Sequence, residues 1–153
     1  MNIGVLFDLD GVVIDSESIY TNFWIDIEKI FPTGIENFAL KIKGSTLPTI
    51  LNTYYPDEEK QAVIMSRIVD FEKNMQYRPF PEALRFIREL KEAGIRCAIV
   101  TSSSQNKMNN LYLQNPGFKE LFDAVITGDV VTHSKPHPEP YLMGASAIGI
   151  QPE

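Results

Sequence analysis

The sequence predicts an α/β fold in which a parallel sheet is interrupted by a long all-helical insert. Three short apolar runs, residues 3–7, 95–100 and 124–127, have the length and composition of buried strands. Helical patterns follow the second and third runs, and this alternation implies a parallel sheet with right-handed crossovers. Between the first and second runs, residues 16–77 show helical periodicity and no strand pattern. A chain of 153 residues is long enough for one ordinary domain or for a core with a modest insert.

The insert is expected to contain a series of helices with recognisable starts. Asp15 or Ser16 can cap a first helix that continues to about residue 30. A weaker helix is expected over residues 36–43, and Thr46 caps a third helix with a proline in its first turn. A longer helix begins after Asp57 and has its apolar positions at Val63, Ile64, Ile68, Phe71 and Met75.

A proline-rich junction separates the insert from the second half of the core. Residues 78–81 read RPFP, which breaks the helical pattern and marks a domain boundary. Core helices are expected over residues 82–93, 105–114 and 138–148. We therefore predict a discontinuous core, residues 1–15 and 79–153, around a helical insert, residues 16–78.

Composition and charge limit the class of protein. The chain is 44% hydrophobic and 22% charged, which is typical of a globular protein. Its formal net charge of -6 and the lack of a basic run argue against a nucleic-acid partner. No apolar run reaches the roughly 18 residues of a membrane span, and the N-terminus has no signal-peptide pattern, so we expect a cytoplasmic protein without membrane contact. The single cysteine, Cys97, lies in the second apolar run and is expected to be buried.

Each predicted strand delivers polar side chains at its carboxyl end. Asp8 and Asp10 follow the first strand, and residues two apart in an extended chain point to the same side. Thr101 and Ser102 follow the second strand, and Lys135 follows the third. Because ligands bind beyond the carboxyl ends of parallel strands, these groups are expected to face one small volume. Two carboxylates, a hydroxyl and a cation suit phosphoryl transfer to an aspartate, with the second acid moving protons.

Two alternatives compete with this interpretation. A receiver domain of a signalling system also places acids, a threonine and a lysine at strand ends. Its phospho-acceptor, however, lies on a middle strand and its first acids are usually adjacent, whereas here Asp8 follows the first strand and Leu9 separates it from Asp10. The other alternative is that the two acids only begin a turn before Gly11.

The same residues resemble the motifs of the haloacid dehalogenase superfamily. Residues 8–12, DLDGV, with residues 15–17, DSE, resemble its first motif, most closely that of the beta-phosphoglucomutase-like phosphatases. Thr101 matches the second motif, and Lys135 in the sequence SKP matches the third. The insert lies where that family has a helical cap, so the resemblance covers essentially the whole chain. It implies a Rossmann-like core and a magnesium-dependent phosphatase that acts on a small, sugar-like phosphate monoester.

The resemblance also implies a role for each matched residue. Asp8 would be the nucleophile and form an aspartyl-phosphate, while Asp10 would protonate the leaving oxygen and then activate water. Thr101 would hydrogen-bond the transferred phosphoryl group with help from the backbone N–H of Ser102. Lys135 would offset the charge between nucleophile and phosphate. The Asp8 carboxylate and the Asp10 backbone carbonyl would ligate Mg²⁺, which prefers oxygen ligands.

The sequence departs from the family pattern in two places. The fourth motif, an acidic pair after a further strand, is expected beyond residue 150, and the sequence ends at Glu153. An incomplete sheet, self-association through the open edge of the first strand, and a catalytically silent phosphate-binding fragment are therefore expected alternatives to a working enzyme. Mutase-type caps carry a basic residue after a Lys-Gly pair, whereas here Lys43 and Gly44 are followed by Leu47. This favours a hydrolase over a phosphosugar mutase.

Other polar and aromatic residues receive simpler interpretations. His133 and His137 flank Lys135, but the sequence offers no cluster of histidines and cysteines, so they are not expected to bind a metal. Lys43 is interpreted as a solvated charge of the insert and Trp24 as a packing residue. The predicted site therefore consists of Asp8, Asp10, Thr101, Ser102 and Lys135.

Overall fold

A computed structural model describes residues 3–151 and contains the predicted parallel sheet. Its strands are β1 (Gly4–Phe7), β2 (Arg96–Val100) and β3 (Ala124–Ile126), in the spatial order β1-β2-β3. Both pairs are parallel, with Val5 opposite Cys97 and Ile99 opposite Val125. The predicted core begins at residue 1 and ends at residue 153; residues 1–2 and 152–153 of it lie outside the described residues.

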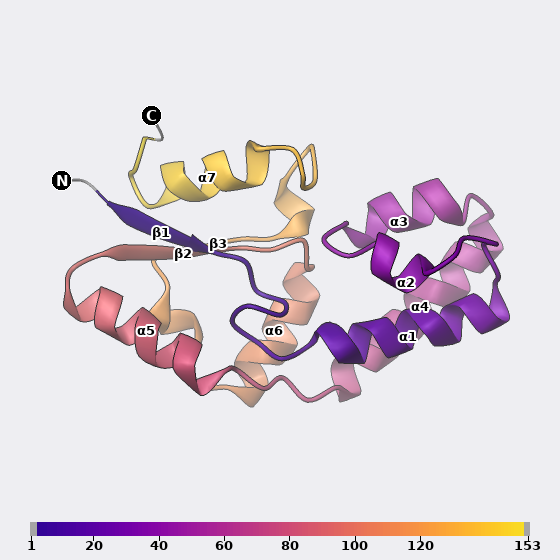
Figure 1. The fold of residues 1–153 in the computed structure, drawn as a ribbon, viewed down its shortest axis with the longest axis horizontal. Helices are drawn as coiled ribbons and strands as arrows, with labels where there is room; N and C mark the ends of the chain where they lie inside the picture. Colours follow the sequence, from indigo (N-terminus) through magenta and orange to yellow (C-terminus); the bar gives the residue numbers. More distant parts are fainter. Residues whose placement is uncertain (1–2, 152–153) are drawn as a thin grey trace.

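Helices cover both faces of the sheet (Figure 1). Helix α7 (Glu139–Ala147) packs on one face, while α5 (Pro81–Glu92) and α6 (Gln105–Gln114) lie on the other. Two short 3₁₀ turns, η1 (Lys119–Leu121) and η2 (Gly128–Val130), flank β3. The architecture is a Rossmann-like α/β core, as the sequence predicts.

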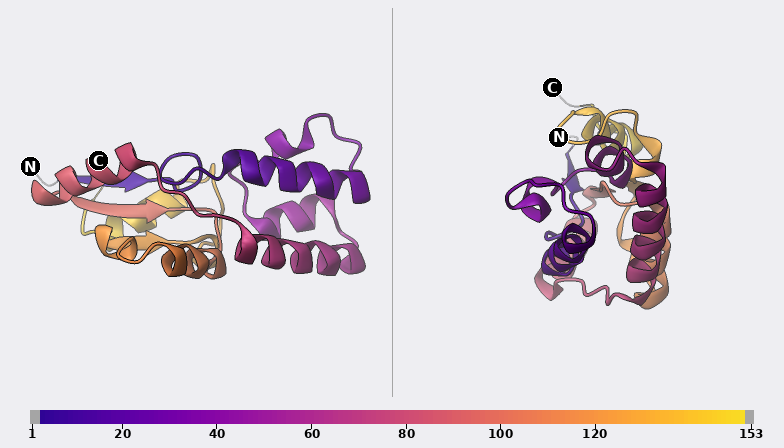
Figure 2. Two further views of the ribbon diagram at one scale, coloured as in Figure 1. Left: turned by 90° about the horizontal axis from the view of Figure 1, so that it is seen from below. Right: turned by 90° about the vertical axis from the view of Figure 1, so that its right-hand side faces the viewer.

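The helical insert extends from the end of the sheet where the strands finish (Figures 1 and 2). Its helices are α1 (Glu17–Ile30), α2 (Phe38–Lys41), α3 (Leu47–Tyr54) and α4 (Glu58–Asn74). The side chains of Thr46 and Asp57 accept backbone N–H bonds in the first turns of α3 and α4, which confirms both predicted caps. The weak second helix is shorter than expected and spans only four residues.

Two separate hydrophobic clusters stabilise the two parts of the molecule. One surrounds the sheet and includes Leu9, Ile87, Ile99, Met108 and Leu111. The other lies among α1–α4 and includes Trp24, Phe38, Ile50, Ile64 and Ile68. Because each cluster buries large aliphatic and aromatic side chains, each contributes its own hydrophobic stabilisation.

The two connections between sheet and insert run side by side. The backbone N–H of Asp15 donates to Arg78 (2.8 Å), and that of Phe80 donates to Val13 (2.9 Å). Before this point, Leu9, Val13 and Ile14 form a buried turn in which Gly11 adopts φ 74°. Paired connections fix the direction in which the insert leaves the sheet.

Two expectations from composition can be compared with the structure. Cys97 is buried within β2, as predicted. Among residues 3–151, no helix is long and apolar enough to cross a membrane.

Candidate active site

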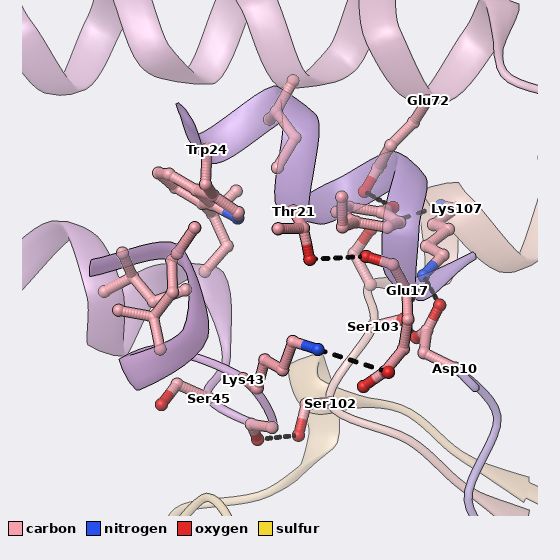
Figure 3. A pocket seen from close by; sticks show the side chains of 18 of the residues that line it. Asp10, Glu17, Thr21, Trp24, Lys43, Ser45, Glu72, Ser102, Ser103 and Lys107 are labelled. Carbon is pink, nitrogen blue, oxygen red and sulfur yellow. Dashed lines mark hydrogen bonds and ion pairs between the residues drawn. The ribbon is translucent and has the colours of Figure 1, made fainter. Parts of the chain in front are cut away.

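A cavity of about 190 Å³ lies where the carboxyl ends of the strands meet the helical insert. The core contributes Asp8, Asp10, Lys107 and the loop of serines after β2, and the insert contributes residues of α1, α2, α3 and α4 and of the loop before α3. Figure 3 shows this lining, with Asp10 and Lys107 among the labelled residues. This is the edge of a parallel sheet at which ligands bind. Of the five residues predicted to face one volume, Asp8, Asp10 and Ser102 line this cavity. Thr101 and Lys135 are not part of its lining, although Lys135 contacts Asp8.

Asp8 and Lys135 form an ion pair in this region, with Lys135 Nζ 2.9 Å from Asp8 Oδ1. The same carboxylate oxygen accepts the backbone N–H of Leu9 (2.8 Å). Lys135 also donates to the backbone carbonyl of Val100 (2.9 Å), which anchors its loop to the end of β2. No hydrogen bond within residues 3–151 reaches Asp8 Oδ2. The arrangement therefore presents a carboxylate with one oxygen held beside a cation and the other available.

The residues of the loop after β2 differ in whether their side chains line the cavity. Thr101 is buried, and its Oγ1 accepts the backbone N–H of Ser103 (3.0 Å). Ser102 lines the cavity and donates its hydroxyl to the backbone carbonyl of Gly44 in the insert (2.6 Å). Gly128 approaches this loop so closely that a Cβ there would lie 2.4 Å from the Ser102 carbonyl oxygen. Ser102 and Ser103 thus line the cavity, while the Thr101 side chain lies behind them.

Asp10 is surrounded by donors. Its Oδ1 accepts the Ser16 hydroxyl and lies 2.5 Å from Lys107 Nζ, and its Oδ2 accepts the Ser103 hydroxyl (2.8 Å). Burial alone would raise the pKa of Asp10. The Lys107 ammonium and the hydrogen bonds from Lys107, Ser16 and Ser103 outweigh that effect, so the pKa lies below its usual value. Of the two predicted caps, Asp15 or Ser16, Ser16 occupies the N-cap position of α1, but its hydroxyl serves Asp10 and makes no cap bond to the helix.

A buried polar chain connects Asp10 to the insert. Lys107 Nζ lies 4.2 Å from the ring centroid of Tyr20, whose hydroxyl donates to Glu72 (2.8 Å). The Tyr77 hydroxyl donates to the backbone carbonyl of Glu72 (2.8 Å). Burial raises the pKa of Glu72, and burial together with nearby carboxylates raises that of Tyr20. The chain therefore joins the site to α1 and α4.

The insert side of the cavity is largely apolar, with lining residues Trp24, Ala39, Ile42, Leu47, Ile50 and Ile68. Trp24 therefore both packs in the insert and reaches the cavity. Lys43 lines the cavity as well and pairs with Glu17 across it (3.2 Å; Figure 3). Its interpretation as a solvated charge is incomplete, because the fold brings it opposite a carboxylate of α1.

The two histidines beside Lys135 lie together on the surface. Their rings are 4.6 Å apart, and His133 Nδ1 lies 2.6 Å from Glu139 Oε2. The backbone N–H of Glu139 donates to His137 Nδ1 (3.1 Å). His133, His137 and Glu139 are close enough to hold an ion, but these contacts already use one nitrogen of each ring.

Sequence reasoning missed the residues that hold Asp10 from the side. Lys107 lies on α6 and Ser103 in the loop before it, while Tyr20 and Glu72 lie on α1 and α4, which are distant in sequence. The one available signal was Lys107 itself, because a lysine in the first turn of a helix is opposed by the helix dipole.

Comparisons with known proteins point to one family. Residues 5–153 match the family of haloacid dehalogenase-like hydrolases. Pyrophosphatase PpaX of Oceanobacillus iheyensis is 31% identical over 156 residues, which cover 97% of this chain and 70% of that protein. PpaX of Bacillus velezensis is 29% identical over 151 residues, which cover 97% of this chain and 69% of that protein.

Solved structures share the fold. A Bacteroides vulgatus protein assigned as a beta-phosphoglucomutase has a TM-score of 0.79 and 28% identity, covering 98% of this chain and 64% of that one. CbbY from Rhodobacter sphaeroides in complex with phosphate has a TM-score of 0.72 and 22% identity, covering 99% of this chain and 75% of that one. The chain thus spans 64% to 75% of the length of these two solved proteins.

Proposed function

Because the chain belongs to the family of haloacid dehalogenase-like hydrolases, we propose that it hydrolyses a small phosphate monoester through an aspartyl-phosphate on Asp8. The observation that carries the proposal is the Asp8–Lys135 pair, in which a carboxylate that lines the cavity has an ammonium 2.9 Å from one of its oxygens. Phosphoryl transfer depends chiefly on such positioning and charge compensation. Residues 16–78 are proposed to form the cap domain that covers the substrate.

Each proposed step uses a side chain of this site. Asp8 attacks the phosphorus and the bond to the leaving oxygen breaks. The negative charge of the bound phosphate raises the pKa of the Asp10 carboxyl, so that Asp10 enters this step protonated and gives the leaving oxygen its proton. Water then attacks the phosphorus of the aspartyl-phosphate, Asp10 takes the proton of that water, and the bond to Asp8 breaks. Lys135 lowers the repulsion between the Asp8 carboxylate and the phosphate, and the Ser102 and Thr101 segment supports the phosphoryl oxygens.

Mg²⁺ is the proposed metal, and the donor set fits it. Asp8 offers the carboxylate oxygen that accepts no hydrogen bond within residues 3–151, and Asp10 offers a backbone carbonyl. Both are hard oxygen ligands, which Mg²⁺ prefers to nitrogen or sulfur. A bound Mg²⁺ would supply charge neutralisation for the phosphate.

The charges around the cavity favour a monoester over pyrophosphate, the substrate class in the name of the PpaX relatives. A second phosphate requires cations beyond those that serve the first. Within residues 3–151, the lysines of the cavity lining are Lys43 and Lys107, and each already pairs with a carboxylate. Leu47 at the insert side supports hydrolysis over phosphosugar transfer, because an apolar side chain there provides no charge for a second phosphate.

Phosphate release from a panel of esters tests this proposal. The panel contains hexose and pentose phosphates, p-nitrophenyl phosphate and pyrophosphate, each with Mg²⁺ and with a chelator. We expect Mg²⁺-dependent release from at least one monoester and much slower release from pyrophosphate. Release from pyrophosphate alone would replace the monoester assignment, and a chain that binds phosphate without turnover would support the silent alternative.

The edge position of β1 supports a proposal about association. Within residues 3–151, β1 is paired only with β2, so its other side carries unpaired backbone groups. Such edges favour pairing with another chain. Light scattering over a range of concentrations should show growth in mass, whereas a constant monomer mass would contradict it.

A further inference from the structure

We propose that Lys107 is a positioning residue that sets the direction of the Asp10 carboxylate and ties it to the helical insert. The inference rests on the proposed function, in which Asp10 transfers the proton to and from the reacting oxygens. The resemblance that identifies Asp8, Asp10, Thr101 and Lys135 includes no role for Lys107. The argument therefore depends on the contacts of Lys107 alone.

The location of Lys107 is unfavourable unless another group compensates for it. Its side chain is only 2% exposed, and a buried ammonium loses its hydration. It is also the third residue of α6, and its backbone N–H donates to the Ser104 cap (3.2 Å). A cation in the first turn meets the positive end of the helix dipole, where an acidic residue is usual. A lysine kept there must be held by strong partners.

The partners that hold Lys107 are Asp10 and Ser103, which both line the candidate active site. Lys107 Nζ is 2.5 Å from Asp10 Oδ1 and 2.8 Å from the Ser103 hydroxyl oxygen, which in turn donates to Asp10 Oδ2. One ammonium group therefore supports both oxygens of the carboxylate, one directly and one through Ser103. This geometry restricts rotation of the Asp10 side chain, as a supporting shell must if a proton is to be transferred accurately.

The opposite side of Lys107 belongs to the insert. Its ammonium faces the Tyr20 ring at 4.2 Å, and the Tyr20 hydroxyl is bonded to Glu72 on α4. Lys107 is thus the point at which Asp10 and the two long helices of the insert meet (Figure 3). Closure of the insert over a substrate and correct direction of Asp10 are coupled through this one side chain.

The dependence of the rate on the leaving group separates positioning from a general structural role. A hexose phosphate has a poor leaving group that needs a proton in the transition state, whereas p-nitrophenolate leaves readily without one. A defect in the direction of Asp10 therefore slows the first substrate far more than the second. A general loss of folded protein slows both substrates equally.

The experiment compares Lys107→Met with the wild-type chain on both esters. We expect kcat for the hexose phosphate to fall by about 10- to 100-fold, part of the ~10²–10⁴-fold of general acid–base catalysis. For p-nitrophenyl phosphate we expect a change below about threefold on the same reasoning. Lys60→Met, which removes an exposed lysine of α4, is the matched control and should leave both rates unchanged.

A double variant tests whether Lys107 acts through Asp10. In an Asp10→Ala background, Lys107→Met should cause no further loss on the hexose phosphate, because the group that it positions is absent. Equal loss on both esters, or full additivity with Asp10→Ala, would overturn the proposal.

A structural measurement covers the case in which the proposed function fails. If the wild-type chain hydrolyses no monoester of the panel, the phosphatase assignment is refuted, and crystal structures of the wild-type and Lys107→Met chains decide the positioning claim. A changed Asp10 side-chain rotamer in Lys107→Met supports it, and an unchanged rotamer overturns it.

Should Lys107→Met fail to fold, Tyr20→Leu and Tyr20→Phe replace it. Loss on the hexose phosphate confined to Tyr20→Leu supports the coupling, and equal behaviour of the two variants refutes it.

Discussion

The two lysine–aspartate pairs of the site look alike but lie in different surroundings. In the Asp8–Lys135 pair the side chains are 38% and 13% exposed, and both stand at the strand ends. In the Asp10–Lys107 pair they are 30% and 2% exposed, and the lysine is a buried residue in the first turn of α6. Because solvent reaches the first pair, Lys135 is able to leave Asp8 and bind a phosphate instead. In the second pair solvent does not reach Lys107, so this lysine holds the Asp10 carboxylate in place.

The largest expected effect is at Asp8. Asp8→Asn keeps the size of the side chain and its contact with the Leu9 N–H but removes the nucleophilic charge. We expect loss of detectable phosphate release from the ester that the wild-type chain hydrolyses, with an unchanged circular dichroism spectrum. Turnover at the wild-type rate would remove Asp8 from its proposed role.

A smaller loss of activity is expected when the Asp8–Lys135 pair loses its cation. Lys135→Met removes the charge beside Asp8 and the bond to the Val100 carbonyl. The expected fall in kcat is about 10²- to 10³-fold, the magnitude typical of removing one charge-stabilising donor. Unlike Lys107→Met, this variant should slow the hexose phosphate and p-nitrophenyl phosphate to the same extent. A strong preference for one ester would show that the two pairs do not differ in role.

The sequence predicts one of these pairs and not the other for a physical reason. Asp8 directly follows β1 and Lys135 lies in the loop that leads from β3 to α7, and parallel strands bring their carboxyl ends together whatever else the chain does. The contact between Asp10 and Lys107 depends on where α6 packs and how its first turn is rotated. Periodicity assigns a lysine to the solvent side of a helix, so it misses a buried lysine that a carboxylate stabilises.

The elements themselves were predicted well where local signals agree. Residues 105–114 are helical with the expected bounds, and each strand differs from its predicted range by only one residue at one end. The helix predicted over residues 36–43 is too long, because Asn37 adopts a left-handed conformation (φ 54°) and the helix ends by residue 41. Val63, one of the apolar positions named for the helix after Asp57, is exposed, whereas Ile64 and Ile68 are buried.

A third prediction concerns the loop that lies between the two pairs. A methyl group at position 128 would meet the Ser102 carbonyl oxygen at 2.4 Å, so Gly128→Ala must displace the loop after β2. We expect kcat/KM to fall by about tenfold, because a shift of ~1 Å in a positioning group can cost ~10²-fold. Gly34→Ala is a control for a general loss of stability: its φ of 74° makes alanine unfavourable there, but a Cβ at Gly34 meets no atom within 4 Å, so it leaves the loop after β2 in place. An unaffected rate in Gly128→Ala would show that Ser102 needs no fixed position.

The smallest effect is on the pH dependence of stability. The folded pKa of Asp10 is lowered, so its ionised form contributes stability that is present above its unfolded pKa and lost as the pH falls through the folded value. Urea unfolding should therefore show that Asp10→Asn destabilises the chain at pH 7 and that this difference shrinks in acid.

The pKa of Glu72 shifts on folding in the opposite direction to that of Asp10, so Glu72 serves as the comparison. Its folded pKa is raised, so it lowers stability as the pH rises from its unfolded pKa through the folded value. Glu72→Gln should remove this decline. The same pH trend for both variants would contradict the assigned directions.

The central claim is that Asp8 carries the phosphoryl group, and acid-quenched samples test it most directly. The wild-type chain is incubated with its best ester and Mg²⁺, quenched within the first turnover, digested and analysed by mass spectrometry. We predict a phosphoryl group on Asp8 within the peptide that contains residues 3–17, and its absence from Asp8→Asn. Phosphate release with no modified Asp8, or a phosphoryl group on another residue, would contradict the account.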